Sequence, residues 1–545
     1  MCGINGFVSK QFNPDKSKEI INRMNDQIIH RGPEDDGYYQ EGNVALGMRR
    51  LSIIDLVSGK QPIIDETGNY VIVFNGEIYN YQKIRADLEK KNYTFKTKSD
   101  TEVLLKAYIA YGVKCLDHLN GMFAFAILDK VNKQLFIARD RLGEKPLIYY
   151  KDSNKFVFAS ELKSIVNCIR PEFPLEIDKP ALRAYLRYTF IPSPLTIYKN
   201  IYKLEPAHYL IVNVDDLSLS KHKYWDTKPV QNTGLVKSYD EAKQQVLQVV
   251  NESTKMRLVS DVPLGVFLSG GIDSSIIAYS MASQSGQRIK TFSIGFSHYK
   301  SFDETAQAQR VAKFIGSEHH QFDLDFDDMR KDIEKIVLNY DEPFADSSAL
   351  PSYWVSKITS DHVTVALTGD GGDEAFGGYN RYLVELYGKK LFFLNYLPKE
   401  LSAKIVNLLP EREENRNGFK FRMLKLIKSH DKDIYRSFLK VISMGFQESE
   451  LSEILLDDLQ GPEFIETSLK DKFANYSSLK MMRNIDRLIS LDGDMCVKVD
   501  RASMLTSIEC RAPYLDHRIF ELTNTFPDKF LLDGNNKKKI LKDAF

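Results

Sequence analysis

The pattern of apolar segments changes character near Trp225–Tyr239, a polar stretch that contains Pro and Gly. Before this stretch, short segments rich in aromatic and β-branched residues are joined by turn residues, and the few helical patterns stand apart. The expected strands include Val71–Asn75, Met122–Leu128, Gln134–Ala138 and Phe156–Ala159, and the expected helices are Lys18–Ile29, Lys83–Lys90 and Thr101–Tyr111. Such grouping predicts layered antiparallel sheets between helices, an α+β domain.

The second part of the chain alternates apolar strands with helices. The expected helices are Tyr239–Leu258, Ser274–Met281 and Glu304–Ile315, and the expected strands are Pro263–Leu268, Thr291–Ile294 and Val363–Leu367. This alternation predicts an α/β domain with a doubly wound parallel sheet, and the pattern is almost wholly helical from about Ala375. We therefore expect one domain over residues 2–215 and a second over residues 235–545.

The composition excludes several classes of protein. Lys+Arg and Asp+Glu are both 74 in the 545 residues, so the formal net charge is zero, which argues against nucleic acid as a partner. The start MCGINGFVSK lacks a signal-peptide pattern, and no segment reaches the ~18–20 apolar residues of a membrane helix. The 5 cysteines are scattered without CxxC spacing. We therefore expect a soluble cytoplasmic protein that contacts no membrane.

Cysteine follows the initiator methionine directly. Cys2 is small enough that we expect removal of the methionine, which would give Cys2 a free α-amino group. Such an amine has a pKa of ~7.7–8.0 and can accept the thiol proton at cytoplasmic pH. Nucleophile and base would then belong to one residue, whereas alone a second-position cysteine could equally be an accident.

Five ordered motifs accompany this cysteine. They are His30-Arg31-Gly32-Pro33, Arg50-Leu51-Ser52-Ile53-Ile54-Asp55, Phe74-Asn75-Gly76-Glu77-Ile78-Tyr79-Asn80, Ser99-Asp100-Thr101-Glu102 and Asn120-Gly121-Met122-Phe123-Ala124. The series resembles that of the class II glutamine amidotransferases, which are N-terminal nucleophile hydrolases, over nearly all of the first two hundred residues.

The resemblance implies a role for each motif residue. Cys2 would attack the side-chain amide of glutamine, with the Asn75 side chain and the Gly76 N–H as the oxyanion hole. Arg50 would pair with the glutamine α-carboxylate, and Glu77 and Asp100 would hold its α-ammonium. The residues that follow Arg50 would also bind glutamine, namely Leu51, Ser52, Ile53 and Ile54. The chemistry agrees, because thioester formation needs oriented donors and an amino acid needs one cation and one or two carboxylates. The alternative for Asn75-Gly76 is a hairpin turn of type I′.

A Gly-rich string follows the strand expected at Pro263–Leu268 and opens a helix. It reads Leu268-Ser269-Gly270-Gly271-Ile272-Asp273-Ser274-Ser275. Glycines let the backbone approach phosphates, and a helix N-terminus favours anions. The string lacks the Lys of a Walker A loop and resembles the SGGxDSS loop of ATP pyrophosphatases. That resemblance implies an adenylating reaction, with Asp273 holding Mg²⁺.

A second Gly-rich string runs from Thr368 through Asp370 and Asp373 to Tyr379. Both strings follow expected parallel strands, and ligands of such sheets bind at the carboxyl ends of the strands. Both loops, together with Val499–Met504 and Glu509–Asp516, resemble the synthetase domain of glutamine-dependent asparagine synthetases. The family's reaction converts glutamine, aspartate, ATP and water into asparagine, glutamate, AMP and pyrophosphate, and ammonia passes inside the protein. By resemblance the ATP-binding residues are Leu268, Ser269, Gly270, Gly271, Asp273, Ser274, Ser275, Ile294, Thr368 and Gly369. Asp373 would be a second magnesium ligand, and Lys538 would stabilise charge at the α-phosphate.

Two departures from the family keep alternatives open. Asp370 stands where many asparagine synthetases have Glu, a carboxylate thought to assist the adenylate chemistry. The chain ends at Phe545, soon after Lys538, so the second domain is expected to be C-terminally short. The alternatives are the same chemistry on another carboxylate, an impaired relic, and Asp370 as a simple helix cap. An intact Cys2 argues against a β-lactam synthetase. A homodimer is compatible with the sequence.

Overall fold

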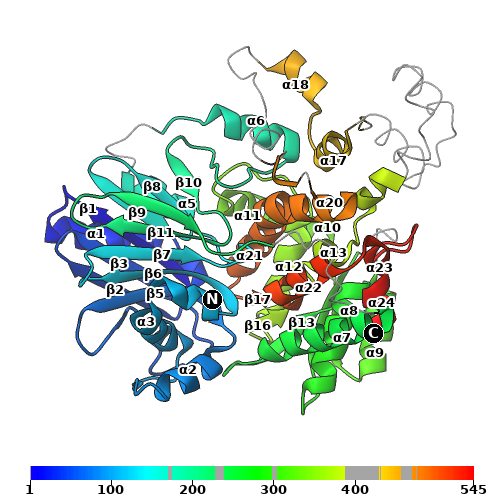
Figure 1. The fold of residues 1–545 in the computed structure, drawn as a ribbon, viewed down its shortest axis with the longest axis horizontal. Coiled ribbons are helices and arrows are strands. Elements are labelled where there is room, and N and C mark those ends of the chain that lie inside the picture. Colours follow the sequence, from blue (N-terminus) through cyan, green and yellow to red (C-terminus); the bar gives the residue numbers. More distant parts are fainter. Residues whose placement is uncertain are drawn as a thin grey trace.

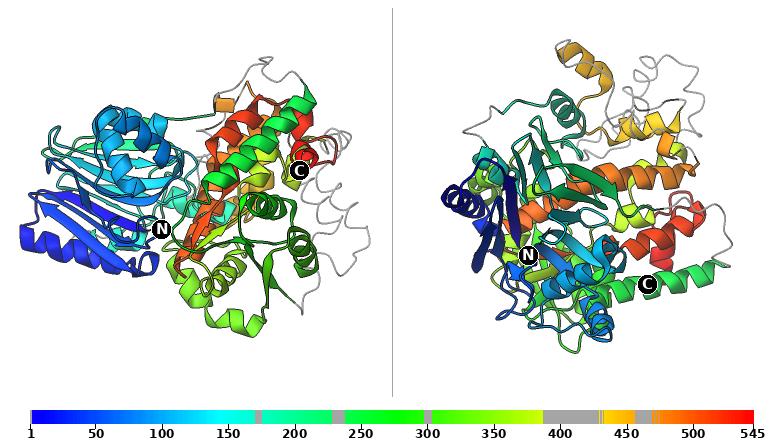
Figure 2. Two further views of the ribbon diagram at one scale, coloured as in Figure 1. Left: turned by 90° about the horizontal axis from the view of Figure 1, so that it is seen from below. Right: turned by 60° about the vertical axis from the view of Figure 1, so that its left-hand side comes forward.

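The protein consists of two halves that lie side by side. The computed structural model describes residues 2–169, 175–227, 238–296, 303–386, 429, 431, 433–455, 469, 471–473 and 475–545. The first half is blue to cyan in Figure 1 and the second is green to red, and the left view of Figure 2 shows the amino-terminal end where the halves meet. Most of the boundary expected at Trp225–Tyr239 lies outside the described residues.

Two antiparallel sheets of six strands form the centre of the first half. One has the order β10-β8-β9-β1-β3-β2 and the other β12-β11-β7-β6-β5-β4. The strands of the first sheet are β1 (Gly3–Ser9), β2 (Asp35–Glu41), β3 (Val44–Arg50), β8 (Ile148–Lys151), β9 (Lys155–Ala159) and β10 (Ile201–Lys203). Those of the second are β4 (Ile63–Ile64), β5 (Tyr70–Ile78), β6 (Gly121–Asp129), β7 (Gln134–Arg139), β11 (His208–Asn213) and β12 (Leu219–Lys223).

Helices cover the outer faces of both sheets. The helices are α1 (Pro14–Asp26), α2 (Tyr81–Glu89), α3 (Asp100–Tyr111), α4 (Cys115–His118), α5 (Leu162–Ile169) and α6 (Lys179–Tyr188). One buried cluster, which includes Ile4, Leu46 and Val73, fills the space between the sheets. Separate clusters join α1 and α5 to the first sheet and α2, α3 and α4 to the second. The expected α+β layering is therefore confirmed.

The second half contains a parallel sheet with the order β15-β14-β13-β16-β17. The strands are β13 (Leu264–Phe267), β14 (Lys290–Gly295), β15 (Glu318–Asp323), β16 (Val365–Leu367) and β17 (Glu509–Arg511). The strands expected at Pro263–Leu268, Thr291–Ile294 and Val363–Leu367 are confirmed. The expectation of an almost wholly helical segment after Ala375 missed β17, which pairs with β16.

The helices of the second half fall into two groups along the chain. The helices before the second Gly-rich loop are α7 (Tyr239–Met256), α8 (Ile272–Gln284), α9 (Thr305–Ile315), α10 (Phe326–Lys331), α11 (Ile333–Asn339) and α12 (Ala349–Thr359). Those after it include α13 (Gly372–Phe376), α17 (Ile434–Ile442), α18 (Glu448–Ile454), α20 (Ser478–Asp486), α21 (Val497–Met504), α22 (His517–Thr525), α23 (Asp528–Leu531) and α24 (Lys539–Ala544). Helix α8 packs on both α7 and α9, and α12 packs on α21, as expected of a doubly wound sheet.

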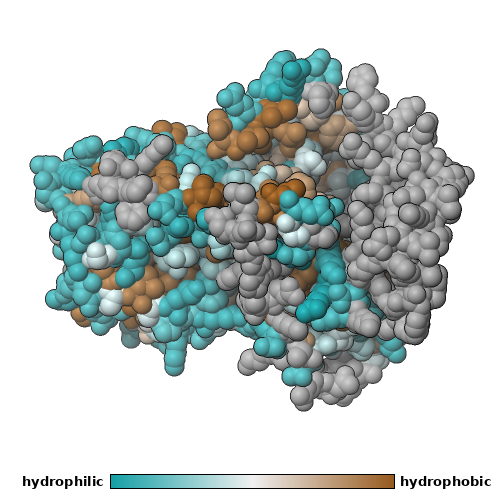
Figure 3. Space-filling model, turned by 90° about the horizontal axis from the view of Figure 1, so that it is seen from above, coloured by the Kyte–Doolittle hydropathy of each residue, from teal (hydrophilic) through white to brown (hydrophobic). Residues whose placement is uncertain are grey.

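A π-helix, η7 (Arg487–Cys496), leads directly into α21. It carries buried side chains to the boundary between the halves, where α21 lies beside the first half in Figure 1. In the part of the chain that the structure describes, no helix combines the length and hydropathy needed to cross a bilayer. In the face drawn in Figure 3, hydrophilic residues cover most of the described surface of the first half.

Candidate functional site

Cys2 immediately precedes β1 and is 7% exposed, at the edge of the cluster between the two sheets. Its backbone nitrogen donates a hydrogen bond of 3.1 Å to Asn75 Oδ1. Burial raises the pKa of the Cys2 thiol, while a hydrogen bond from the Leu51 backbone and the charge of Arg50 act in the opposite direction. A buried thiol of this kind needs a nearby base to become a nucleophile.

Asn75 and Gly76 lie inside β5 rather than in a turn, so the type I′ turn is wrong. Asn75 pairs with Ala124 and Gly76 with Phe123 of β6. Among the described residues, Asn75 Nδ2 is buried without a hydrogen-bond partner. Gly76 has φ 152, and a Cβ there would lie 2.1 Å from Met122 O, so only glycine fits. The Asn75 side chain thus contacts Cys2 through Oδ1 and has an unused hydrogen-bond donor in Nδ2.

Arg50 ends β3, and the following loop wraps around its guanidinium group. Arg50 Nη2 donates to Ile54 O at 3.2 Å and to Asp55 O at 2.8 Å. The loop includes Leu51, Ser52 and Ile53, and it is also held by the second half of the chain. Asp261 N donates to Ile53 O at 2.9 Å, and Asp261 Oδ2 accepts from Asp55 N at 2.8 Å.

Glu77 and Asp100 form a buried acidic group near this loop. Burial raises the pKa of Asp100 to about 6, although Oδ2 accepts a hydrogen bond of 2.9 Å from Ile78 N. The pKa of Glu77 lies well above its ordinary value because of burial and the nearby carboxylates of Glu509 and Asp100. Arg511 Nη2, from the second half, lies 3.5 Å from Glu77 Oε1. A ligand ammonium would stabilise these carboxylates in their charged forms.

The first Gly-rich loop connects β13 to α8. Gly270 has φ 78, and a Cβ there would lie 2.7 Å from Ala308 N. Ser269 Oγ lies 3.0 Å from Ser274 Oγ and accepts from Gly271 N at 3.2 Å. Gly271 caps α8 without any side-chain hydrogen bond, which leaves backbone N–H groups of the first turn for a ligand.

Both Gly-rich loops line one cavity of about 530 Å³. The expected site residues in its wall are Ser269, Gly271, Asp273, Ser274, Thr368, Gly369, Asp370, Asp373 and Lys538. The expected residues Leu268, Gly270, Ser275 and Ile294 are not part of this wall. Leu268 follows β13 and is 1% exposed, and Ile294 lies in the neighbouring strand β14. The structure therefore gathers nine expected residues from three distant parts of the chain.

Lys538 bridges the two expected magnesium ligands. Its Nζ contacts Asp273 Oδ2 and lies 2.7 Å from Asp373 Oδ1. Among the described residues, Asp273 Oδ1 is buried without a hydrogen-bond partner, and burial raises the pKa of Asp273 to about 6. A Cβ at Gly378 would lie 1.8 Å from Asp373 Oδ1, so glycine makes room for this arrangement. An unused carboxylate oxygen beside a second carboxylate fits the oxygen-ligand preference of Mg²⁺.

Asp370 is not a helix cap. Gly371 is the N-cap residue of α13, and no side chain caps that helix. Asp370 lies in the wall of the large cavity and also of a small cavity of about 30 Å³. Burial raises its pKa. The interpretation of Asp370 as a simple cap is wrong, and the residue lines the cavity that the two loops form.

Several residues of this cavity had no role assigned from the sequence. Lys498 lies in the wall, with Nζ 3.0 Å from Asp346 Oδ2 and 2.9 Å from Ser348 Oγ. Glu374 and Tyr379 share a hydrogen bond of 2.9 Å in the same wall. In the sequence, the position of Lys498 directly before the motif Val499–Met504 was the one feature that could have indicated a role for it in the site.

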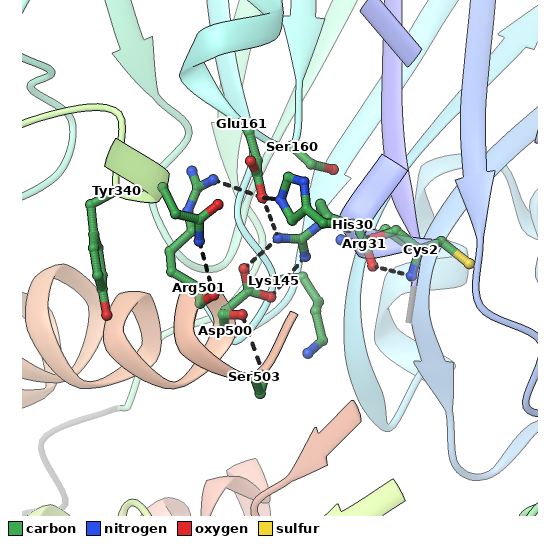
Figure 4. A network of polar contacts seen from close by, with 12 residues as sticks. Cys2, His30, Arg31, Lys145, Ser160, Glu161, Tyr340, Asp500, Arg501 and Ser503 are labelled. Atoms are coloured by element: carbon green, nitrogen blue, oxygen red, sulfur yellow. Dashed lines mark hydrogen bonds and ion pairs between the residues drawn. The ribbon is translucent and has the colours of Figure 1, made fainter. Parts of the chain in front are cut away.

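Two small cavities extend from this site toward the first half. The one of about 30 Å³ shares Asp370 with the large cavity, and the other has about 40 Å³. Glu144, Cys496 and Asp500 line both small cavities. Burial raises the pKa of Glu144 to about 8. Asp500 also contacts Arg31, whose Nε donates to Cys2 O at 3.1 Å (Figure 4).

Comparisons with known proteins cover both halves. The profile of a glutamine amidotransferase domain matches residues 1–225, and that of asparagine synthase matches residues 245–545. "Asparagine synthetase [glutamine-hydrolyzing] 1" of Bacillus subtilis (strain 168) is 36% identical, over 100% of this chain and 84% of the relative. "Asparagine synthetase [glutamine-hydrolyzing] 3" of the same organism is 30% identical with the same coverage of both chains.

Proposed function

The chain belongs to the family of glutamine-hydrolysing asparagine synthetases, and we propose how its own residues carry out the family's reaction. The enzyme is a ligase that moves the amide nitrogen of glutamine to aspartate and converts ATP into AMP and pyrophosphate. One observation carries the residue assignment: Lys538, near the end of the chain, joins Asp273 and Asp373 in a cavity formed by both Gly-rich loops.

In the first step, Cys2 attacks the side-chain carbonyl carbon of glutamine. With the methionine removed, the α-amine of Cys2 takes the thiol proton and gives it to the departing nitrogen, so ammonia leaves and a thioester forms. Asn75 Nδ2 and the Gly76 N–H donate to the oxyanion. Water then hydrolyses the thioester to glutamate.

Substrate binding in this half uses the charges around Cys2. Arg50, directly before the segment Leu51 to Ile54, pairs with the α-carboxylate of glutamine. Glu77 and Asp100 accept hydrogen bonds from the α-ammonium. Both carboxylates are buried, so the pair would bind an ammonium more strongly than exposed carboxylates would.

In the second half, a carboxylate oxygen of aspartate attacks the α-phosphorus of ATP and pyrophosphate leaves. Ser269, Gly271 and Ser274 hold phosphate oxygens at the N-terminus of α8, together with Gly270 and Ser275. Thr368 and Gly369 close over the nucleotide. Adenosine contact by Leu268 and Ile294, which lie outside the cavity wall, stays a prediction from the resemblance. Lys538 neutralises charge that develops at the α-phosphate.

We assign the magnesium to Asp273 and Asp373. No group of three or more side chains able to hold a metal gathers in the described residues, so phosphate oxygens and water would complete the ligands. When bound, Mg²⁺ neutralises phosphate charge during adenylation.

Ammonia then attacks the acyl carbon of the adenylate, and AMP leaves. Asp370 accepts the proton that the attacking nitrogen loses. The two small cavities and their shared lining by Glu144, Cys496 and Asp500 support an internal route for ammonia. Each of these cavities has room for one ammonia molecule. Such a route keeps ammonia away from bulk water, where it would be protonated.

The cysteines of the described residues form no disulfide, which favours a reducing compartment, and we infer the cytoplasm. The oligomeric state, including a homodimer, stays a prediction.

The test supplies ATP, Mg²⁺ and glutamine with a panel of carboxylates and measures AMP, ADP and the amidated product. We expect AMP, pyrophosphate and asparagine with aspartate. ADP instead of AMP would contradict adenylation, and AMP release that prefers another carboxylate would contradict aspartate as the acceptor.

A further inference from the structure

Arg31 connects the two halves of the chain through a buried ion pair. The residue ends the 3₁₀ turn η1 (Ile29–Arg31), and its side chain is 0% exposed. Its Nη1 donates to Asp500 Oδ2 at 2.7 Å and its Nη2 to Asp500 Oδ1 at 2.8 Å. Two parallel bonds of this kind fix the plane of the guanidinium group as well as its position.

Another edge of the same guanidinium group contacts the backbone of Cys2, the candidate nucleophile. Arg31 Nε donates to the carbonyl oxygen of Cys2 at 3.1 Å. Figure 4 shows Arg31 between Cys2 on one side and Asp500 on the other. Because the guanidinium is planar and rigid, a shift of Asp500 would be transmitted to the backbone of Cys2.

Surrounding charges keep Arg31 in this orientation. Glu161 Oε1 accepts from Arg31 Nη1 at 2.9 Å and lies 2.8 Å from Arg501 Nη1. Asp500 and Arg501 are neighbours in α21, so this helix contacts Arg31 and its partner Glu161 together. Burial alone would raise the pKa of Asp500, but the charge and hydrogen bonds of Arg31 keep it below its ordinary value.

We propose that Asp500, a residue of the synthetase half, is a positioning residue for glutamine hydrolysis in the other half. Through Arg31 it fixes the backbone of Cys2, and so the direction in which the thiol meets the glutamine carbonyl. This inference rests on the proposed role of Cys2. Catalysis is sensitive to such placement, because a shift of ~1 Å at a reacting group can lower the rate by ~10²-fold.

A second buried ion pair at the same interface provides the matched control. Arg139 Nη2 lies 2.9 Å from Asp492 Oδ1, with side-chain exposures of 4% and 1%. This pair also joins the first half to the second. The Arg139 side chain donates its hydrogen bonds to the carbonyl oxygens of Lys145, Leu204 and Gly143, and none of them reaches Cys2.

The experiment compares D500N, R31K and D492N in the full chain. Glutamate release is measured without ATP and aspartate, so the transfer of ammonia to the synthetase site does not affect the measured rate. The melting temperature of each variant is measured as well. Arg31→Lys keeps a positive charge beside Asp500 but removes the Nε–H donor to Cys2. This variant therefore tests the link to Cys2 if Asp500→Asn fails to fold.

We expect kcat for glutamate release to fall by ~10-fold or more in Asp500→Asn and in Arg31→Lys. Asp492→Asn should melt earlier than the wild type, with kcat per folded enzyme within ~3-fold of it. Equal kcat losses in Asp500→Asn and Asp492→Asn, or wild-type kcat in folded Arg31→Lys, would overturn the inference. Glutamate release by Cys2→Ala would instead overturn the proposed function, so the two failures are distinguishable.

Discussion

Asn75 Oδ1 accepts a hydrogen bond from the backbone nitrogen of Cys2 at 3.1 Å. Within the described structure, the other end of the same side chain, Nδ2, is buried without a partner. An unused buried donor costs stability, on the order of 1–3 kcal/mol, and its retention next to the nucleophile fits an oxyanion ligand.

Asn75→Ala should therefore lower kcat for glutamine hydrolysis by ~10²–10³-fold, because one oxyanion donor is lost. Asparagine formation from ammonium should remain near the wild-type rate, since Asn75 lies outside the synthetase cavity. Glutamate and asparagine are measured separately with each nitrogen source. Equal losses with both sources would contradict the assignment.

The KM for glutamine should rise at acidic pH. Burial raises the pKa of Asp100 to about 6, so Asp100 takes up a proton as the pH falls through that value. The neutral carboxyl attracts the glutamine ammonium less, and the KM should be lower above pH 6 than below it. The measurement is a KM profile from about pH 5 to about pH 8, a range in which ordinary aspartates do not titrate.

Asp100→Asn is the control for that profile. Its KM should stay near the acidic-pH value of the wild type at every pH and should show no step near pH 6. A step that persists in Asp100→Asn would assign the titration to another group.

Asp273→Asn should abolish AMP formation and leave glutamate release without ATP unaffected. The substitution removes the charge of the buried carboxylate that lies beside Lys538 and Asp373. AMP and glutamate are measured on the same preparation. Normal AMP formation in this variant would remove Asp273 from the magnesium site, and loss of both activities would indicate a folding defect.

Asp370 should matter for turnover rather than for stability. Because it does not cap α13, Asp370→Asn should change the melting temperature little and lower kcat for AMP release with aspartate by ~10²-fold. Asp370→Glu tests the reach of the carboxylate. If only the Glu variant accepted aspartate well, the natural acceptor would be another carboxylate.

The sequence predicted most of the elements and candidate residues because their signals are local. Apolar strands next to Gly-rich loops identified β13 and the cavity wall around Asp273. The alternative of a type I′ turn at Asn75-Gly76 is wrong because dipeptide preferences do not include the pairing of Gly76 with Phe123 of β6. The strand β17 has three residues, too few for a periodic pattern, and it forms through its pairing with β16.

Contacts between the halves lay beyond sequence reasoning for a different reason. Arg31 and Asp500 are 469 positions apart, and each belongs to a motif that can be interpreted within its own half. Nothing in either motif indicates that the two side chains meet. The position of Lys498 in the cavity wall depends in the same way on how η7 and α21 pack.

The central claim is that Cys2 supplies ammonia to a separate synthetase site, and Cys2→Ala tests it most directly. Wild type and variant are incubated with ATP, Mg²⁺ and aspartate, with either glutamine or ammonium as nitrogen source, and asparagine, glutamate and AMP are measured. We predict that the variant forms asparagine and AMP from ammonium at near the wild-type rate and forms neither asparagine nor glutamate from glutamine. Glutamine hydrolysis by the variant at near the wild-type rate would contradict the account.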